Sequence, residues 1–206
     1  MSDDELPKSL ERSLLEIANN INNDQFMLME YLGPVVDGCR AALNVSIDMV
    51  QELSKMSEDD FEQHISSVTD SYKEITFCIK AIDLDEEYSV VFDKGRASVF
   101  DECVEPDVII SSENDLLVKL FNSDPKLSPT EVLGDKLHIS GTDSMDIVEG
   151  LGFLCYPSLL RVAKSGIDPS SILSEDADSV IMVAASDLVV KMIRKWIDAQ
   201  LAMSDV

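Results

Sequence analysis

The spacing of apolar residues predicts amphipathic helices over the first seventy residues. Apolar positions recur at helical spacing after Pro7, a favoured residue at a helix start. A second apolar run, 26–32, ends at Gly33-Pro34, where a helix should stop or bend. A longer helix follows, and SEDD at 57–60 is a capping box that opens another. The three apolar stripes are Leu10, Leu14, Ile17 and Ile21; Val36, Cys39, Leu43, Ile47, Val50 and Leu53; and Phe61, Ile65, Val68 and Tyr72.

Near residue 74 the apolar period changes from that of a helix to that of a strand. The next residues alternate, and YSVVFDKGRASVF at 88–100 predicts a hairpin that turns at Asp93-Lys94-Gly95. Pro106 begins a fourth short strand, DVIIS. In the first strand the buried side is Ile75, Phe77, Ile79 and Ala81, and the other side is Thr76, Cys78 and Lys80.

The segment SPTEVLGDKLHISG, 128–141, predicts a very short helix followed at once by a short strand. Ser128 and Glu131 form a capping box around Pro129, which is placed at the first helical position. Gly134 ends the helix. The strand that follows has Leu137 and Ile139 on its buried side and His138 on its solvent side, and it stops at Gly141.

Helices are predicted on both sides of this segment. Ser112 and Asp115 form a capping box for the helix ENDLLVKLFN, helical spacing returns after Gly141, and a long final helix covers about 178–203. Strands followed by helices imply one sheet with one covered face. The expected fold is therefore α+β, with a single, mostly antiparallel, five-stranded sheet and helices covering one face. The expected organisation is a helical N-terminal extension (1–56), an α+β domain (57–156), and a loop with a C-terminal helix (157–206).

The order of these elements resembles the sterol carrier protein type two family. In that family a Pro/Asp-Val-x-Ile strand leads into a helix, a short helix that begins with proline, and a Gly-Lys-Leu-x-Ile-x-Gly strand. Residues 107–110, 127–133 and 134–141 match the first, third and fourth of these elements, with Asp135 inserted after the glycine. The resemblance covers about 57–156, and the flanking residues have no counterpart in the family.

The resemblance implies a non-enzymatic carrier. In such a protein a lipid, fatty acyl chain, isoprenoid or quinone lies in a hydrophobic tunnel between the sheet and its helices. The residues expected to line the tunnel are Phe77, Ile79, Phe92, Leu117, Leu120, Phe121, Val132, Leu133, Ile139, Met145, Val148 and Leu151.

An ordinary packed core accounts for the same apolar stripes, because the apolar face of a helix is buried by default. With its interior filled, the chain would instead be a protein-interaction module. It would then dimerise or dock a partner through its added helices, along the stripe Ile181, Ala185, Leu188, Met192 and Trp196.

The chain is strongly acidic, with a formal net charge of −24. Phosphate backbones repel such a polyanion, so no nucleic-acid partner is expected. Residues 157–206 contain seven acidic and five basic residues, so this part of the chain repels an anionic partner least. The basic cluster Lys191, Arg194 and Lys195 precedes Trp196. It favours either a transient contact with an anionic membrane surface or partner, or simply well-placed charges near a helix C-terminus.

No residue pattern indicates catalysis, a metal site or a cofactor. The two histidines, His64 and His138, have no cysteine or histidine at ligand spacing. No apolar run approaches about 18 residues, so stable membrane insertion is not expected. The acidic start lacks the pattern of a secretory signal, which predicts a cytoplasmic protein. The four cysteines, Cys39, Cys78, Cys103 and Cys155, are far apart and are expected to be free thiols.

Overall fold

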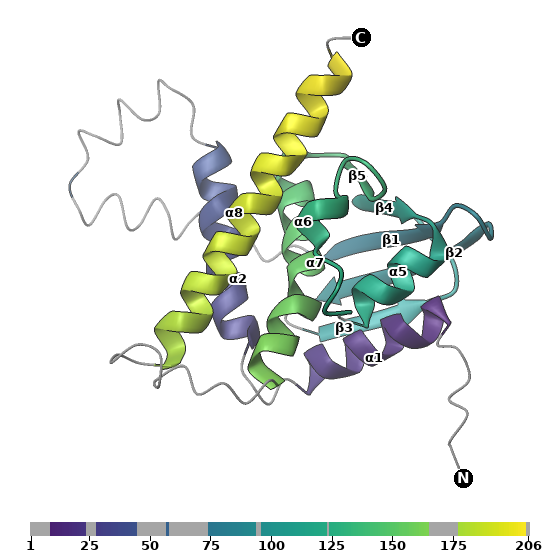
Figure 1. Ribbon diagram of the computed structural model, residues 1–206, viewed down its shortest axis with the longest axis horizontal. Coiled ribbons are helices and arrows are strands. Elements are labelled where there is room, and N and C mark those ends of the chain that lie inside the picture. Colours follow the sequence, from purple (N-terminus) through teal and green to yellow (C-terminus); the bar gives the residue numbers. More distant parts are fainter. Residues whose placement is uncertain are drawn as a thin grey trace.

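The computed structural model describes residues 9–23, 28–44, 57, 74–93, 96–122, 124–164 and 177–204. They form one five-stranded sheet, the helices that cover it, and further helices packed on the outer side of those (Figure 1). The strands are β1 (Ile75–Ala81), β2 (Glu86–Asp93), β3 (Arg96–Phe100), β4 (Val108–Ser112) and β5 (His138–Gly141). The helices are α1 (Leu10–Asn22), α2 (Leu28–Asn44), α5 (Asn114–Phe121), α6 (Pro129–Val132), α7 (Ser144–Lys164) and α8 (Ala177–Ser204).

The strand order in the sheet is β3-β2-β1-β4-β5. The pairs β1–β2, β2–β3 and β4–β5 are antiparallel, and only β1–β4 is parallel. Phe77 lies at the centre, paired with Val90 on one side and Val108 on the other. The α+β class and the mostly antiparallel five-stranded sheet are therefore confirmed.

The alternation of β1 gives the sheet a covered face. Ile75, Phe77, Ile79 and Ala81 are buried, as expected, on the face of the sheet that α1, α5 and α7 cover. Cys78 points to the opposite face yet is also buried, which the alternation did not predict. The cause is a disulfide to Cys103, which brings the connection after β3 over this part of the sheet.

Helix α7 is the middle layer of the molecule. Thirteen of its 21 residues are buried, because the sheet lies on one side of it and α2 and α8 lie on the other. Two glycines allow this close packing. A β-carbon on Gly150 would lie 2.8 Å from Ile139 Cδ1 of β5, and one on Gly152 would lie 2.5 Å from Val36 Cγ2 of α2.

Three local predictions differ from the structure in whole or in part. Helix α2 continues through Pro34, because Leu28, Leu32 and Val36 are buried on either side of the proline and their packing outweighs its cost of about 3 kcal/mol. Ser112 does not cap α5: Glu113 is the N-cap, and the Ser112 hydroxyl donates to the Lys136 carbonyl oxygen at 2.7 Å.

The third concerns α6, where Ser128 is the N-cap and Pro129 the first residue, as predicted, but the capping box is absent. The Ser128 hydroxyl hydrogen-bonds Thr130 Oγ1 at 2.8 Å instead.

The remaining predictions include confirmed elements, a boundary that falls inside a helix, and segments that lie outside the described residues. Helices α1 and α8 and the β2–β3 pairing are confirmed, and His138 is exposed. The predicted boundary after residue 156 falls inside α7, and α1 of the predicted N-terminal extension packs on β3 and α5. The predicted helix over 57–72, with His64, lies outside the described residues except for Ser57, as does the predicted helix beyond Asn44.

Candidate functional site

Most of the residues expected to line a tunnel lie together in one buried core. Phe92 is half-buried against this core, and Met145 is partly exposed. The other ten are buried: Phe77, Ile79, Leu117, Leu120, Phe121, Val132, Leu133, Ile139, Val148 and Leu151.

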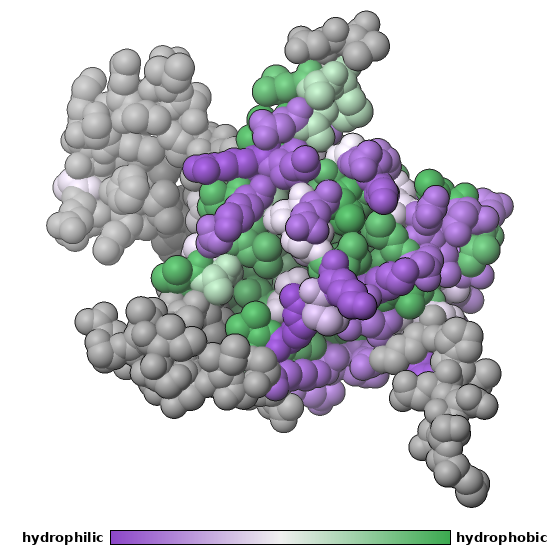
Figure 2. All heavy atoms as spheres, in the orientation of Figure 1, coloured by the Kyte–Doolittle hydropathy of each residue, from purple (hydrophilic) through white to green (hydrophobic). Residues whose placement is uncertain are grey.

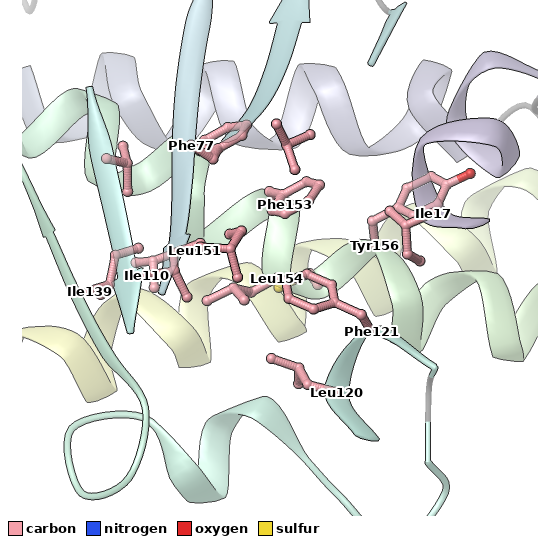
Figure 3. Close-up of a cluster of buried hydrophobic side chains, with 14 of the residues drawn as sticks. Ile17, Phe77, Ile110, Leu120, Phe121, Ile139, Leu151, Phe153, Leu154 and Tyr156 are labelled. Carbon is pink, nitrogen blue, oxygen red and sulfur yellow. The ribbon is translucent and has the colours of Figure 1, made fainter. Parts of the chain in front are cut away.

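Side chains of α7 pack among these residues. The Phe153 ring stacks on Phe77 with centroids 4.9 Å apart and planes 8° apart, and it meets Phe121 at 5.7 Å (Figure 3). Leu151 and Leu154 lie beside them, and both are fully buried. The region between the sheet and α5 thus contains tightly packed side chains of the chain itself.

A groove of about 330 Å³ opens elsewhere, between β5 and the C-terminal third of α8. We call it the β5–α8 groove. Figure 1 shows that α8 crosses the molecule and that its end projects past β5. The space-filling view shows hydrophobic surface at this projecting end (Figure 2). The groove is lined by the apolar Leu133, Leu137, Ile139 and Ile147, by Gly134 and Gly141, by the polar His138, Ser140 and Gln200, and by Trp196, Ala199 and Met203 of α8.

The turn between α6 and β5 determines how closely α8 approaches β5 at the groove. Gly134 has a φ of +85°, a conformation that glycine adopts without the strain of a side chain. Its N–H donates to the Leu137 carbonyl oxygen at 2.8 Å, which closes the turn. A β-carbon on Gly134 would lie 2.7 Å from Ala199 Cβ, so the glycine allows α8 to approach this turn. The segment 128–141 therefore sets the strand beside the last helix.

Trp196 provides the least satisfied polar atom of the groove. Its indole is partly buried against the core, and its Nε1 is shielded from solvent without an acceptor among the described residues. A buried N–H without a partner costs about 1–3 kcal/mol. An acceptor in the groove would remove this cost only after a turn of the indole that exposes Nε1.

The predicted basic cluster and Trp196 face different ways. Lys191, Arg194 and Lys195 are exposed, whereas Trp196 packs inward. The Lys191 Nζ pairs with Asp187 at 2.6 Å. Arg194 and Lys195 have no ion pair within the part of the chain that the structure describes.

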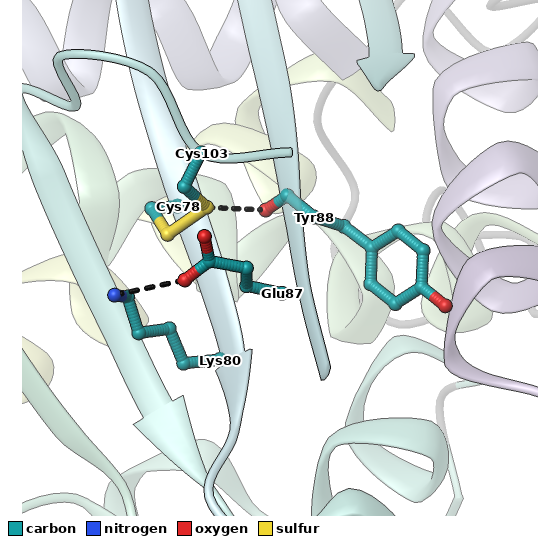
Figure 4. Close-up of a disulfide and its surroundings, with 5 residues drawn as sticks. All are labelled: Cys78, Lys80, Glu87, Tyr88 and Cys103. Carbon is teal, nitrogen blue, oxygen red and sulfur yellow. Dashed lines mark hydrogen bonds and ion pairs between the residues drawn. A yellow bond between two sulfur atoms is a disulfide. The ribbon is translucent and has the colours of Figure 1, made fainter. Parts of the chain in front are cut away.

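The cysteines differ from the expectation of four free thiols. Cys78 of β1 and Cys103 form a disulfide (Figure 4). The prediction of free thiols is therefore wrong for this pair, because a separation of 25 residues gives no signal and only the strand pairing brings the two together. Beside the disulfide, Lys80 Nζ lies 2.9 Å from Glu87 Oε2, and Cys103 Sγ lies 3.3 Å from the Tyr88 carbonyl oxygen.

Cys39 and Cys155 are free. Burial raises the pKa of the Cys155 thiol, and neighbouring Cys39 raises it further. Burial also raises the pKa of Cys39. A raised pKa keeps a thiol protonated, which is the opposite of what a nucleophilic cysteine needs.

One group of three metal-ligand atoms occurs in the described ranges. The group consists of the sulfurs of Cys78 and Cys103 and a carboxylate oxygen of Glu87, which all lie within 4.8 Å of one another. Both sulfurs are joined in the disulfide and Glu87 is paired with Lys80, so the group is not a ligand set while the disulfide is intact. Among the described helices, none is both long and apolar enough to cross a membrane.

No protein-family model matches the chain, and neither a curated protein nor a solved structure matches it. The resemblance to the sterol-carrier family thus stays a prediction from the motif residues. The groove has to be interpreted from its own geometry.

Proposed function

We propose that this chain is a non-enzymatic binding protein for a small hydrophobic ligand, and that the ligand lies in the β5–α8 groove. The observation that carries the proposal is this largely apolar groove, lined in part by the indole of Trp196, whose Nε1 is shielded and has no acceptor among the described residues. The groove volume of about 330 Å³ is within the usual range for small-molecule sites, about 300–1,000 Å³.

The ligand class follows from the lining. An apolar body gains about 25 cal/mol for each Å² that it removes from water. A carbonyl or carboxylate oxygen would accept from Trp196 Nε1 once the indole turns this atom toward the groove. Acyl chains, isoprenoids with an oxygen group and quinones all combine these two features. The site shares Leu133 and Ile139 with the expected tunnel but lies at the surface.

The test uses the chain's single tryptophan as its reporter. A titration with 2-decanone, which has an apolar chain and one carbonyl acceptor, should shift the Trp196 emission saturably. Met203→Asp places a charge in the groove and should weaken binding about five- to tenfold, from the lost apolar contact.

Leu201→Asp is the matched control. Leu201 is 60% exposed and Met203 is 62% exposed on the same helix, but only Met203 lines the groove. The control should bind as the unchanged protein does. The proposal fails if no saturable shift occurs, or if both variants weaken binding equally.

A second candidate function is the interaction module. The packed interior supports it, and so do the exposed apolar side chains on the side of α8 that faces away from the body. This role needs no ligand.

A further inference from the structure

The outward side of α8 carries a regular stripe of exposed apolar side chains. Val183, Val190 and Ile197 are seven residues apart and are 67%, 36% and 37% exposed, and Leu201 follows at 60%. At about 100° per residue, all four lie within about 40° of one another around the helix. We call these four residues the outer stripe. A seven-residue apolar repeat is the spacing of a seam between two helices.

The outer stripe is distinct from the face that packs on the molecule's own body. Ala185 and Met192 of the stripe predicted for dimerisation are 0% exposed, and Leu188 and Trp196 are partly buried against the core. These residues are occupied by intramolecular contacts. Helix α8 therefore has two apolar faces, one used within the molecule and one that faces outward.

Charge makes this helix the most favourable place for a second copy. The chain carries a net charge of −24, so most of its surface repels another copy. Helix α8 itself has three acidic and three basic residues. Two of them, Arg194 and Asp187, lie about 40° and about 60° from the centre of the outer stripe at 100° per residue.

We propose that the outer stripe is the interface of a homodimer, in which two copies of α8 pack antiparallel about a two-fold axis beside Val190. This arrangement sets Asp187 of one copy against Arg194 of the other, and the two-fold repeats the pair. It also brings Val183 of one copy next to Ile197 of the other. The inference rests on the interaction role and is independent of the ligand groove.

The antiparallel direction follows from the same charges. In a parallel pair, Asp187 would face Asp187 and Arg194 would face Arg194, so like charges would repel each other at both positions. The antiparallel pair replaces both repulsions with attractions. Arg194, which lacks an ion pair in the described ranges, then gains one, and Asp187 keeps Lys191 beside it.

The test is sedimentation equilibrium of the full chain at about 0.15 M salt, where exposed charges farther apart than about 8 Å are screened. The mass should rise from monomer to dimer as the concentration increases to about 200 µM. Val190→Asp should abolish the dimer. Met203→Asp lies on the same helix but outside the outer stripe, and it should leave the dimer intact.

Charge reversal tests the direction of packing. Asp187→Arg and Arg194→Asp should each weaken the dimer about tenfold, because each turns two attractive pairs into repulsive ones. The double variant should restore it. In a parallel dimer the single changes would have no such effect and the double change would rescue nothing.

Three results would overturn the proposal: a monomer throughout the concentration range, a dimer that Val190→Asp does not affect, or a double variant as weak as the single ones. All of the changed side chains are exposed, and circular dichroism checks that each variant is folded. The 2-decanone titration of the Val190→Asp variant separates the two functions, since the loss of the dimer should leave the Trp196 signal unchanged.

Discussion

Gly134 and Ala199 are in contact with no space for a β-carbon on the glycine. The glycine belongs to the turn that precedes β5, and the alanine belongs to α8. An added β-carbon would lie 2.7 Å from Ala199 Cβ, and the φ of +85° is unfavourable for any residue with a side chain. This contact fixes the distance between the two walls of the β5–α8 groove.

Gly134→Ala should therefore destabilise the protein by about 2 kcal/mol, from the left-handed backbone and the displaced helix together. Urea unfolding measures the loss. Gly38→Ala is the matched control, because nothing lies within 4 Å of its added β-carbon and Gly38 is inside α2. That change should stabilise the protein by about 0.5–1 kcal/mol. Equal effects of the two substitutions would contradict the role given to Gly134.

The contact between α7 and α2 gives a second prediction. A β-carbon on Gly152 would lie 2.5 Å from Val36 Cγ2, so Gly152→Ala should cost about 1–3 kcal/mol through overpacking. Val36→Ala removes the obstructing methyl groups. In a double-mutant cycle measured by urea unfolding, the two changes together should cost less than the sum of the single costs. Simple additivity would show that the two helices do not meet at this point.

The disulfide gives a third prediction. Replacing both Cys78 and Cys103 with serine should destabilise the protein by about 3 kcal/mol, because the bridge closes a loop across a separation of 25 residues in the unfolded chain. Cys39→Ser should have a much smaller effect. Alkylation of the denatured, non-reduced protein, followed by mass measurement, should label only Cys39 and Cys155. Labelling of all four cysteines without a reductant would disprove the bridge.

The fourth prediction concerns Asp37, whose pKa is raised above 3.8 by burial and partly lowered again by Arg40 at 3.9 Å. The folded state then holds the proton more tightly than the unfolded chain. The stability that protonated Asp37 contributes is fully present below about pH 3.8, and it is lost as the pH rises through the pKa of Asp37 in the folded state. The Asp37→Asn variant has no carboxyl to ionise and avoids that loss. The free energy of unfolding of the variant, minus that of the unchanged protein, should therefore increase between about pH 3 and about pH 7.

Glu149→Gln is the comparison for Asp37. Arg40 lies 2.5 Å from Glu149 of α7, and the arginine side chain is only 14% exposed. Removing this charge should destabilise the protein at neutral pH, opposite in sign to Asp37→Asn. Unfolding midpoints at the two pH values measure both changes. An Asp37→Asn difference that does not vary with pH would reject burial as the dominant influence on Asp37.

The elements that could be predicted from the sequence are those with one buried and one exposed side. The alternation in β1, the hairpin signal and the apolar stripe of α1 all led to confirmed elements, because burial fixes the register of such segments. The burial of Cys78 could not be predicted in this way, since its cause is a partner 25 residues away.

Local rules failed where tertiary contacts act on the same residues. A helix was expected to stop or bend at Pro34, and packing of the neighbouring residues keeps α2 from stopping there. Ser112 is a good capping residue by type, but pairing with Ala81 of β1 keeps it in a strand, where its hydroxyl donates to the backbone carbonyl of Lys136. In both cases the competing contact comes from a distant segment, and no local pattern reports it.

The candidate site was predicted only in part. Leu133, Ile139 and Trp196 were singled out, but the first two were assigned to an interior tunnel and the third to a surface cluster. The predicted domain ended at residue 156, within a helix whose residues are buried on nearly all sides, GLGFLCYP at 150–157. Such an all-round apolar stretch is the signal that α7 fills the interior.

Asn22, the last residue of α1, hydrogen-bonds the edge strand β3 of the sheet. Its side-chain amide donates to the Ala97 carbonyl oxygen at 2.8 Å and accepts from the Ala97 N–H at 2.8 Å. These are two of the backbone groups through which an additional strand would join β3. Asn22 thus occupies part of this sheet edge, so the growth of aggregates by sheet extension is impeded there.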